Sequence, residues 1–220
     1  MPIIFISKNK SFIQKIKKEG FNGKFCNLED YKPRKFIKTY YILPGNSFGY
    51  MDTGLEFVYS QILFINIQKL VLFIINKYGK LNLENKRYLP IGSSIILDYL
   101  NDTYLVYSPS MLTPQNVYKT KNAYYSCISS LFNILENQKE DIDDIDIIIP
   151  SICCGIGGMD VCTSISQIKS AISSYKYYVP TQIYNNIIIH EPNLDEQPLY
   201  IQNKIFKEVN ISKIYAKQPF

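Results

Sequence analysis

Two segments of this chain have residue types that could bind an anion. In residues 40–56, an apolar run leads through Pro44 and Gly45 to Gly54, and in residues 147–160 three isoleucines lead through Pro150 to a loop with several glycines. Each segment has the order strand, proline, glycine-bearing turn, helix. Loops at the carboxyl ends of strands form the ligand crevice of open α/β sheets, and a helix N-terminus there offers free N–H donors. Together the two loops favour a ligand site over the alternative, in which the glycines only make tight turns.

Neither loop has a standard nucleotide-binding pattern. The P-loop pattern Gly-x-x-x-x-Gly-Lys-Ser/Thr and the dinucleotide pattern Gly-x-Gly-x-x-Gly are both absent. The net charge of +5 comes almost wholly from lysine, and it suits a phosphate-bearing ligand without requiring one.

The cysteines, the histidine and an acidic run offer weaker candidates for chemistry. Cys153 and Cys154 lie in the second loop, but we expect them to be small buried hydrophobic residues rather than nucleophiles. Five cysteines without a Cys-x-x-Cys pair favour reduced thiols, and the single histidine, His190, excludes a histidine-rich metal site. The acidic run 141–146 lacks the glycine and spacing of a calcium loop and is interpreted as a solvated turn before a strand. We therefore predict no metal and no cofactor.

Composition places the chain among globular proteins. It has 220 residues, 46% apolar and 20% charged, and its abundance of Ile, Asn, Lys and Tyr is the bias of an AT-rich genome. The longest apolar stretch, 61–75, is interrupted by polar residues and is shorter than the roughly 20 residues of a membrane helix. The N-terminus lacks the basic segment and cleavage site of a signal peptide. We expect an intracellular protein, cytoplasmic or nuclear, without a membrane partner.

The elements that must position the two loops alternate along the chain. Short β-branched or aromatic runs predict strands at 3–6, 23–26, 39–43, 94–99, 104–107 and 144–149. Apolar residues at helical spacing predict helices at 10–18, 55–78, 121–137 and 160–173. Several strands are apolar at consecutive positions, which is typical of strands covered on both faces. The predicted fold class is α/β, a three-layer α/β/α sandwich with a mixed, largely parallel sheet.

The character of the chain changes after residue 178. Residues 1–178 are predicted to form one domain, and 179–220 a C-terminal extension packed on it, with one more strand at 187–189.

Four ordered motifs, at 46–54, 89–93, 108–117 and 155–158, resemble the macro domain family. The first is similar to the pattern Asn-Ser-Phe-Gly-x-Met-Asp-Gly-Gly-x-Asp of its macro-like branch. The resemblance covers roughly residues 1 to 175. It implies an α/β/α sandwich that binds ADP-ribose, and some members of the family hydrolyse ADP-ribose from proteins, nucleic acids or O-acetyl esters.

The resemblance also implies site residues. Asn46 corresponds to the asparagine beside the distal ribose, and Glu56 falls where hydrolytic relatives place an aspartate, so these two are the catalytic candidates. The loop 155–158 corresponds to the segment that wraps the diphosphate with backbone N–H groups. The implied ligand-binding residues are Asn46, Ser47, Gly54, Ser151, Gly155, Ile156, Gly157 and Gly158.

The chain departs from the family pattern at several positions. Thr53 replaces a glycine of the first loop, and Glu56 is one methylene longer than the aspartate it replaces. An acid that reads the adenine is expected after the second strand. Residues 27–30 offer two carboxylates, Glu29 and Asp30, but not at the usual place, and we interpret them as a solvated turn.

The leading hypothesis is a macro-like domain that binds ADP-ribose or an ADP-ribosylated protein or nucleic acid, with hydrolysis of the ADP-ribosyl bond left open. Three alternatives stay open with it: a reader that binds without hydrolysis, a phosphatase acting on ADP-ribose 1''-phosphate, and an interaction scaffold without ligand binding.

Overall fold

The computed structural model describes residues 2–35, 37–100, 102–137 and 145–176. In chain order its elements are β1 (Ile3–Ser7), α1 (Lys10–Lys18), β2 (Asn22–Phe25), β3 (Lys38–Asn46), α2 (Gly54–Val58), the π-helical turn η1 (Tyr59–Leu63), α3 (Ile67–Tyr78), β4 (Lys80–Leu81), β5 (Arg87–Tyr88), β6 (Ile95–Asp98), β7 (Thr103–Met111), α4 (Asn122–Asn137), β8 (Ile145–Pro150) and α5 (Val161–Lys176). The predicted extension 179–220, including His190, lies outside the described residues, as do residues 141–144 of the acidic run.

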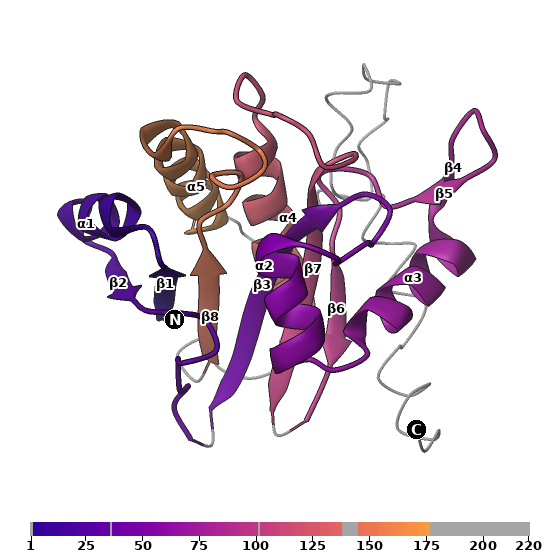
Figure 1. Ribbon diagram of the computed structural model, residues 1–220. Coiled ribbons are helices and arrows are strands. Elements are labelled where there is room, and N and C mark those ends of the chain that lie inside the picture. Colours follow the sequence, from indigo (N-terminus) through magenta and orange to yellow (C-terminus); the bar gives the residue numbers. More distant parts are fainter. Residues whose placement is uncertain (1, 36, 101, 138–144, 177–220) are drawn as a thin grey trace.

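Six strands form one sheet in the order β2-β1-β8-β3-β7-β6 (Figure 1). Every neighbouring pair is parallel except β6 and β7. The register pairs Ile4 of β1 with Ile148 of β8, and Tyr41 of β3 with the same Ile148. All six strands predicted from the sequence are therefore present, and the mixed, largely parallel sheet is confirmed.

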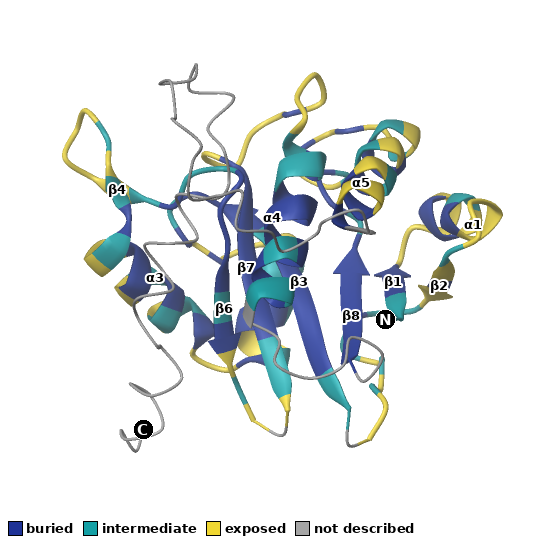
Figure 2. Cartoon of the chain, turned by 180° about the vertical axis from the view of Figure 1, so that it is seen from behind, coloured by how far each residue is buried: buried dark blue, intermediate teal, exposed yellow. Residues whose placement is uncertain are grey.

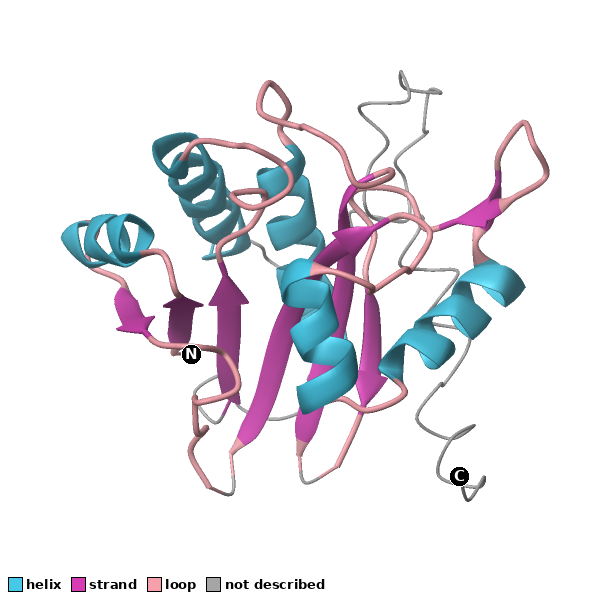
Figure 3. Ribbon diagram, in the orientation of Figure 1, coloured by secondary structure: helices cyan, strands magenta, loops and turns pink. Residues whose placement is uncertain are grey.

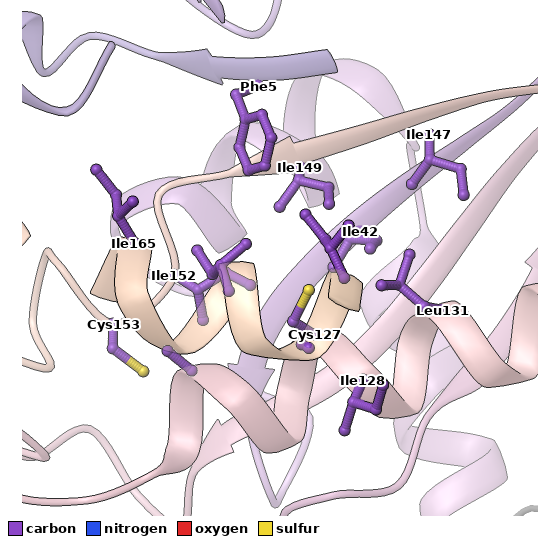
Figure 4. Packing of buried hydrophobic residues seen from close by; sticks show 14 of the residues in the cluster. Phe5, Ile42, Cys127, Ile128, Leu131, Ile147, Ile149, Ile152, Cys153 and Ile165 are labelled. Atoms are coloured by element: carbon purple, nitrogen blue, oxygen red, sulfur yellow. The ribbon is translucent and has the colours of Figure 1, made fainter. Parts of the chain in front are cut away.

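Helices cover both faces of this sheet (Figure 3). Along each central strand, alternate side chains enter two separate apolar cores. Ile42 and Ile149 pack on one face with Cys127 of α4 and with residues of α1 and α5 (Figure 4). Tyr41 and Leu43 pack on the other face with residues of η1 and α3. Strands β8, β3 and β7 are buried on both faces and are dark blue in Figure 2. This burial confirms the predicted three-layer sandwich.

The single helix predicted over 55–78 is wrong. The segment breaks into α2, η1 and α3, and the axes on the two sides of the break differ by 112°. Tyr59 and Phe64 are buried with their rings stacked at 5.8 Å, and the Tyr59 hydroxyl donates to the Ile42 carbonyl oxygen at 2.9 Å. Asn66 then adopts a left-handed conformation with φ 69°, which asparagine tolerates better than most residues. The packing of these two aromatic rings against the sheet therefore breaks the single helix that the spacing of the apolar residues predicted.

Asp146 corrects the interpretation of the acidic run as a solvated turn. It lies in β8, is fully buried, and accepts two hydrogen bonds from the Arg34 guanidinium, at 2.9 Å from Nε and 2.8 Å from Nη2. Arg34 comes from the connection between β2 and β3, 112 positions away in the sequence. The Asp146 carboxylate is therefore the buried member of an ion pair whose other member, Arg34, is exposed.

The short hairpin β4–β5 was not predicted, because each of its strands has only two residues. No single helix in the described ranges is long and apolar enough to cross a membrane, and the bent pair of segments Gly54–Leu63 and Ile67–Tyr78 passes that test only when the two are taken together.

Candidate functional site

A cavity of about 550 Å³ lies at the carboxyl ends of the neighbouring strands β2, β1, β8 and β3, and Met111 at the end of β7 also lines it. Glu29 reaches it after β2, residues 7–9 after β1, residues 151 and 153–157 after β8, and residues 54–56 after β3. This is the edge at which ligands bind in open α/β sheets. The two glycine-bearing loops singled out in the sequence are therefore brought to one cavity.

The structure separates the predicted site residues into two groups. Six line the cavity: Gly54, Glu56, Ser151, Gly155, Ile156 and Gly157. The other three, Asn46, Ser47 and Gly158, are not part of the cavity wall, and the side chains of Asn46 and Ser47 are buried.

Asn46 organises the first loop and holds Glu56. Its side-chain Nδ2 donates to the Tyr50 carbonyl oxygen at 2.6 Å and to Glu56 Oε1 at 3.4 Å. Its Oδ1 accepts from the backbone N–H groups of Phe48 and Tyr50. The Asn46 side-chain amide is therefore used in hydrogen bonds to the loop and to Glu56. Asn46 influences the cavity by holding the Glu56 side chain in place.

Glu56 is the titratable group of the cavity whose environment favours acid–base chemistry. Burial raises the pKa of Glu56 to about 7, although the hydrogen bond from Asn46 opposes the rise. A carboxyl group with a pKa near neutrality can both take and give a proton at physiological pH.

The second loop offers backbone donors. It is closed by hydrogen bonds from the Gly158 N–H to the Gly155 oxygen and from the Met159 N–H to the Cys153 oxygen, both at 3.0 Å. Within the described part of the chain, the N–H groups of residues 154–157 donate to no protein acceptor. Successive free N–H groups of this kind make a concave anion site.

Gly155 and Gly157 of this loop differ in how much space a side chain would have. A Cβ on Gly157 would lie 2.7 Å from the Cys153 carbonyl oxygen, so the turn itself requires a glycine there. A Cβ on Gly155 would meet nothing within 4 Å, so packing does not require that glycine. Gly155 lies on the cavity wall.

The backbone of Ser47 forms hydrogen bonds with two of the other sequence motifs. Its N–H donates to the Met111 carbonyl oxygen at 2.9 Å, and its carbonyl oxygen accepts from the Leu89 N–H at 2.8 Å. The Val117 N–H in turn donates to the Gly157 oxygen at 2.8 Å. The four motifs are therefore connected by backbone hydrogen bonds around the cavity.

Glu29 lies on the cavity wall, which corrects its interpretation as part of a solvated turn. Its Oε2 is buried and has no hydrogen-bond partner, while Lys8 Nζ lies 3.9 Å from its Oε1. Asp30 does not line the cavity; it is exposed and accepts from Asn27 Nδ2 at 2.7 Å. A buried carboxylate oxygen without a donor is unusual in folded proteins.

The cysteines of the cavity are poorly suited to nucleophilic chemistry. Cys26, Cys153 and Cys154 line it, and burial raises the pKa of all three thiols, that of Cys153 to about 12. The thiolate is the reactive form, so a raised pKa disfavours attack by these groups. All five cysteines are free.

The first loop tolerates the departure at Thr53. Its φ of −145° is ordinary extended backbone, whereas Gly54 has a φ of +63°, which favours glycine. The position that requires a glycine has kept it.

Sequence reasoning missed the contribution of the segment after β1. Ser7, Lys8 and Asn9 line the cavity, the Ser7 hydroxyl donates to Ser151 Oγ at 3.3 Å, and Asn9 caps α1 by accepting from the Phe12 N–H. The available signal was a third strand-to-helix junction with a capping asparagine.

Comparisons with known proteins find similarity among solved structures. No protein-family model and no curated protein sequence matches this chain. The fold is similar to that of the macrodomain of Mycobacterium tuberculosis DarG, with 14% identity and a TM-score of 0.49 over 64% of this chain and 84% of that chain. It is also similar to the Oceanobacillus iheyensis macrodomain with ADP, with 12% identity and a TM-score of 0.47 over 84% of this chain and 88% of that chain.

Proposed function

We propose that this chain binds ADP-ribose, free or attached to a protein or nucleic acid, in the cavity at the carboxyl edge of the sheet. The observation that carries the proposal is the order of polar groups along that edge. The sheet order places Glu29 after β2, Lys8 after β1, the loop 153–157 after β8 and Glu56 after β3.

This order suits a ligand with a base at one end, a diphosphate in the middle and a second ribose at the other end. The three strand spacings between β2 and β3 amount to about 14 Å, so only an elongated ligand would reach both ends. The free N–H groups of residues 154–157 and the Lys8 ammonium lie between the two carboxylates and favour a dianionic centre.

Glu29 is suited to read the base. Glu29 lines the cavity with a side chain that is 25% exposed, and the exocyclic amino group of adenine would donate to its carboxylate. A hydrogen bond to a charged partner contributes about 1.5–3 kcal/mol, which corresponds to roughly a 10- to 150-fold change in affinity.

The experiment compares the binding of two ligands, which differ only in the base, to wild type and to two variants. Calorimetry with ADP-ribose and with its inosine analogue, which has a carbonyl oxygen in place of the amino group, is expected to show a preference for ADP-ribose of at least tenfold. Glu29→Gln should reduce that preference, because an amide can donate to the inosine oxygen. Asp30→Asn is the matched control, because Asp30 follows Glu29 in the sequence but does not line the cavity. This variant should keep the preference for ADP-ribose. If neither ligand binds wild type, the scaffold alternative replaces the proposal.

A second candidate function, hydrolysis of the ADP-ribosyl bond, is favoured by Glu56. Its carboxylate lies in the cavity at the end opposite Glu29, with a pKa of about 7. Water would attack the anomeric carbon of the distal ribose, the bond to the target would break, and Glu56 would accept the proton of the water. The turnover rate should therefore rise with pH through about 7, as the base form accumulates.

The test of this second candidate is Glu56→Gln. It should keep ADP-ribose affinity within a few-fold and lower turnover roughly 100-fold, the usual scale for loss of a general base. Binding by wild type without release of ADP-ribose from a modified target would favour the reader. Release of phosphate from ADP-ribose 1''-phosphate would favour the phosphatase.

A further inference from the structure

The backbone of Cys153 has a conformation that is rare for its residue type. Its φ is 62°, in the left-handed region that residues with a side chain seldom adopt. In the part of the chain that the structure describes, the other non-glycine residues with a positive φ are Asn66, Asn85 and Asp102. Asparagine and aspartate tolerate this region because their short polar side chains can form local hydrogen bonds. Cysteine lacks that advantage, so the surrounding structure has to hold Cys153 in place.

Contacts on both sides of the residue hold Cys153 in this conformation. Its side chain is 5% exposed and belongs to the apolar core that includes residues of α4 and α5 (Figure 4). Its Sγ lies 4.0 Å from the carbonyl oxygen of Ser110 in β7. Its own carbonyl oxygen accepts from the Met159 N–H at 3.0 Å. Packing in the core and a hydrogen bond across the loop therefore fix the turn at this residue.

The turn at Cys153 sets the direction of the residues that follow it. Residues 154–157 line the cavity, and within the described ranges their N–H groups donate to no protein acceptor. Gly157 folds back onto Cys153, because a Cβ added to it would lie 2.7 Å from the Cys153 carbonyl oxygen and 3.1 Å from the Cys153 Cα. Left-handed residues in such turns direct successive N–H groups into one concave anion site. A different φ at Cys153 would therefore reorient these N–H groups.

We propose that Cys153 is a positioning residue of the anion-binding loop, and that its left-handed backbone keeps the free N–H groups of residues 154–157 arranged for a pyrophosphate group. The inference rests on the proposed binding of a diphosphate by this loop. The role belongs to the backbone of Cys153, while its thiol fills the core. A loop that is already arranged before binding loses less conformational entropy when the ligand arrives, and its affinity is higher for that reason.

Three variants separate the backbone of Cys153 from its packing. Cys153→Val tests the backbone, because a β-branched residue is strongly disfavoured at positive φ. Cys127→Val is the matched control: Cys127 is fully buried in the same core, belongs to α4 and does not line the cavity (Figure 4). Cys153→Gly is the rescue variant, because glycine adopts the left-handed conformation without a steric penalty.

The experiment titrates the full isotope-labelled chain with inorganic pyrophosphate and follows the backbone amide shifts of residues 154–157. Wild type and Cys127→Val are expected to bind pyrophosphate within about twofold of each other. Cys153→Val should weaken binding by about tenfold or more, which is the scale of the cost of a left-handed backbone for a residue with a side chain. Cys153→Gly should stay within about threefold of wild type, although it removes a buried side chain.

Several results would overturn the inference. They are an unchanged pyrophosphate affinity in Cys153→Val, an equal loss in Cys127→Val, a loss of more than tenfold in Cys153→Gly, and loop amides of wild type that do not shift with pyrophosphate. Circular dichroism shows whether each variant keeps its fold. If Cys153→Val is misfolded, Cys153→Thr, which is also β-branched, takes its place with Cys127→Thr as its control.

The same titrations distinguish this inference from the proposed function. Pyrophosphate binding at residues 154–157 without any binding of ADP-ribose would refute the proposed function and leave the role of Cys153 standing. Equal affinity of wild type and Cys153→Val for ADP-ribose would refute the role of Cys153 and leave the proposed function standing.

Discussion

Replacing Glu56 by glutamine should remove a pH dependence of stability. The folded-state pKa of Glu56 is about 7, against about 4.3 for an unperturbed glutamate. Between these two values the folded state binds a proton that the unfolded state has lost. The unfolding free energy of wild type should therefore fall as pH rises through this window, and the loss should be complete above pH 7.

The magnitude follows from the difference between the two pKa values. Between pH 5 and pH 8.5 the full effect is close to 3 kcal/mol, at about 1.4 kcal/mol for each pH unit up to the folded pKa. Glu56 keeps some contact with solvent, which screens the charge, so we expect about 2 kcal/mol. Glu56→Gln has no carboxyl group to ionise, and its side-chain oxygen can still accept from Asn46.

Urea unfolding at several pH values measures the effect. The chain has 19 tyrosines and no tryptophan, so circular dichroism is the suitable signal. Glu56→Gln should gain about 2 kcal/mol relative to wild type between pH 5 and pH 8.5. Glu84→Gln is the control, because Glu84 is exposed and its ion pair with Lys86 is exposed too, and it should change stability by less than about 0.5 kcal/mol at either pH. A difference between wild type and Glu56→Gln that is the same at every pH would refute the reasoning.

Four further substitutions test the loop, the ion pair between Arg34 and Asp146, and the thiols. Gly157→Ala should lower the unfolding free energy by about 1–3 kcal/mol in urea unfolding, because its Cβ would lie 2.7 Å from a carbonyl oxygen, whereas Gly155→Ala should leave it nearly unchanged; equal losses would contradict this account of the loop. Arg34→Met should cost about 3 kcal/mol in the same assay, since it leaves Asp146 buried without its partner, and a loss below about 1 kcal/mol would show that the pair is not structural. Cys154→Ser should keep ADP-ribose affinity and any turnover within a few-fold by calorimetry and product analysis; loss of turnover with intact binding would instead point to thiol chemistry.

Most of the fold could be predicted from the sequence because its signals are local. Short β-branched or aromatic runs marked all six strands of the sheet, and the bounds of α1 agree with the predicted helix at 10–18. The glycine-bearing loops were identified for the same reason, since a strand followed by proline and glycine is a short-range pattern. The wall of the cavity at residues 54–56, 151 and 153–157 follows from those loops.

The rest depended on contacts between distant segments. The break after η1 follows from the packing of Tyr59 and Phe64 under the sheet, which helical spacing alone does not reveal. The burial of Asp146 required Arg34, and the exposure of Glu29 to the cavity required its position beside β1. Asn46 was expected to touch the ligand, and its hydrogen bonds within the loop emerge only once Tyr50 and Glu56 are placed.

The most direct test of ADP-ribose binding is a titration of the isotope-labelled chain followed by backbone amide chemical shifts. The amides of residues 154–157 and 54–56 are expected to shift together and to saturate, while those of the β4–β5 hairpin stay in place. Gly155→Glu places a negative side chain on the cavity wall, at a position where an added Cβ meets nothing within 4 Å, and it should abolish these shifts while the rest of the spectrum is kept. An absence of shifts with wild type at millimolar ADP-ribose, or shifts confined to another face, would contradict the account.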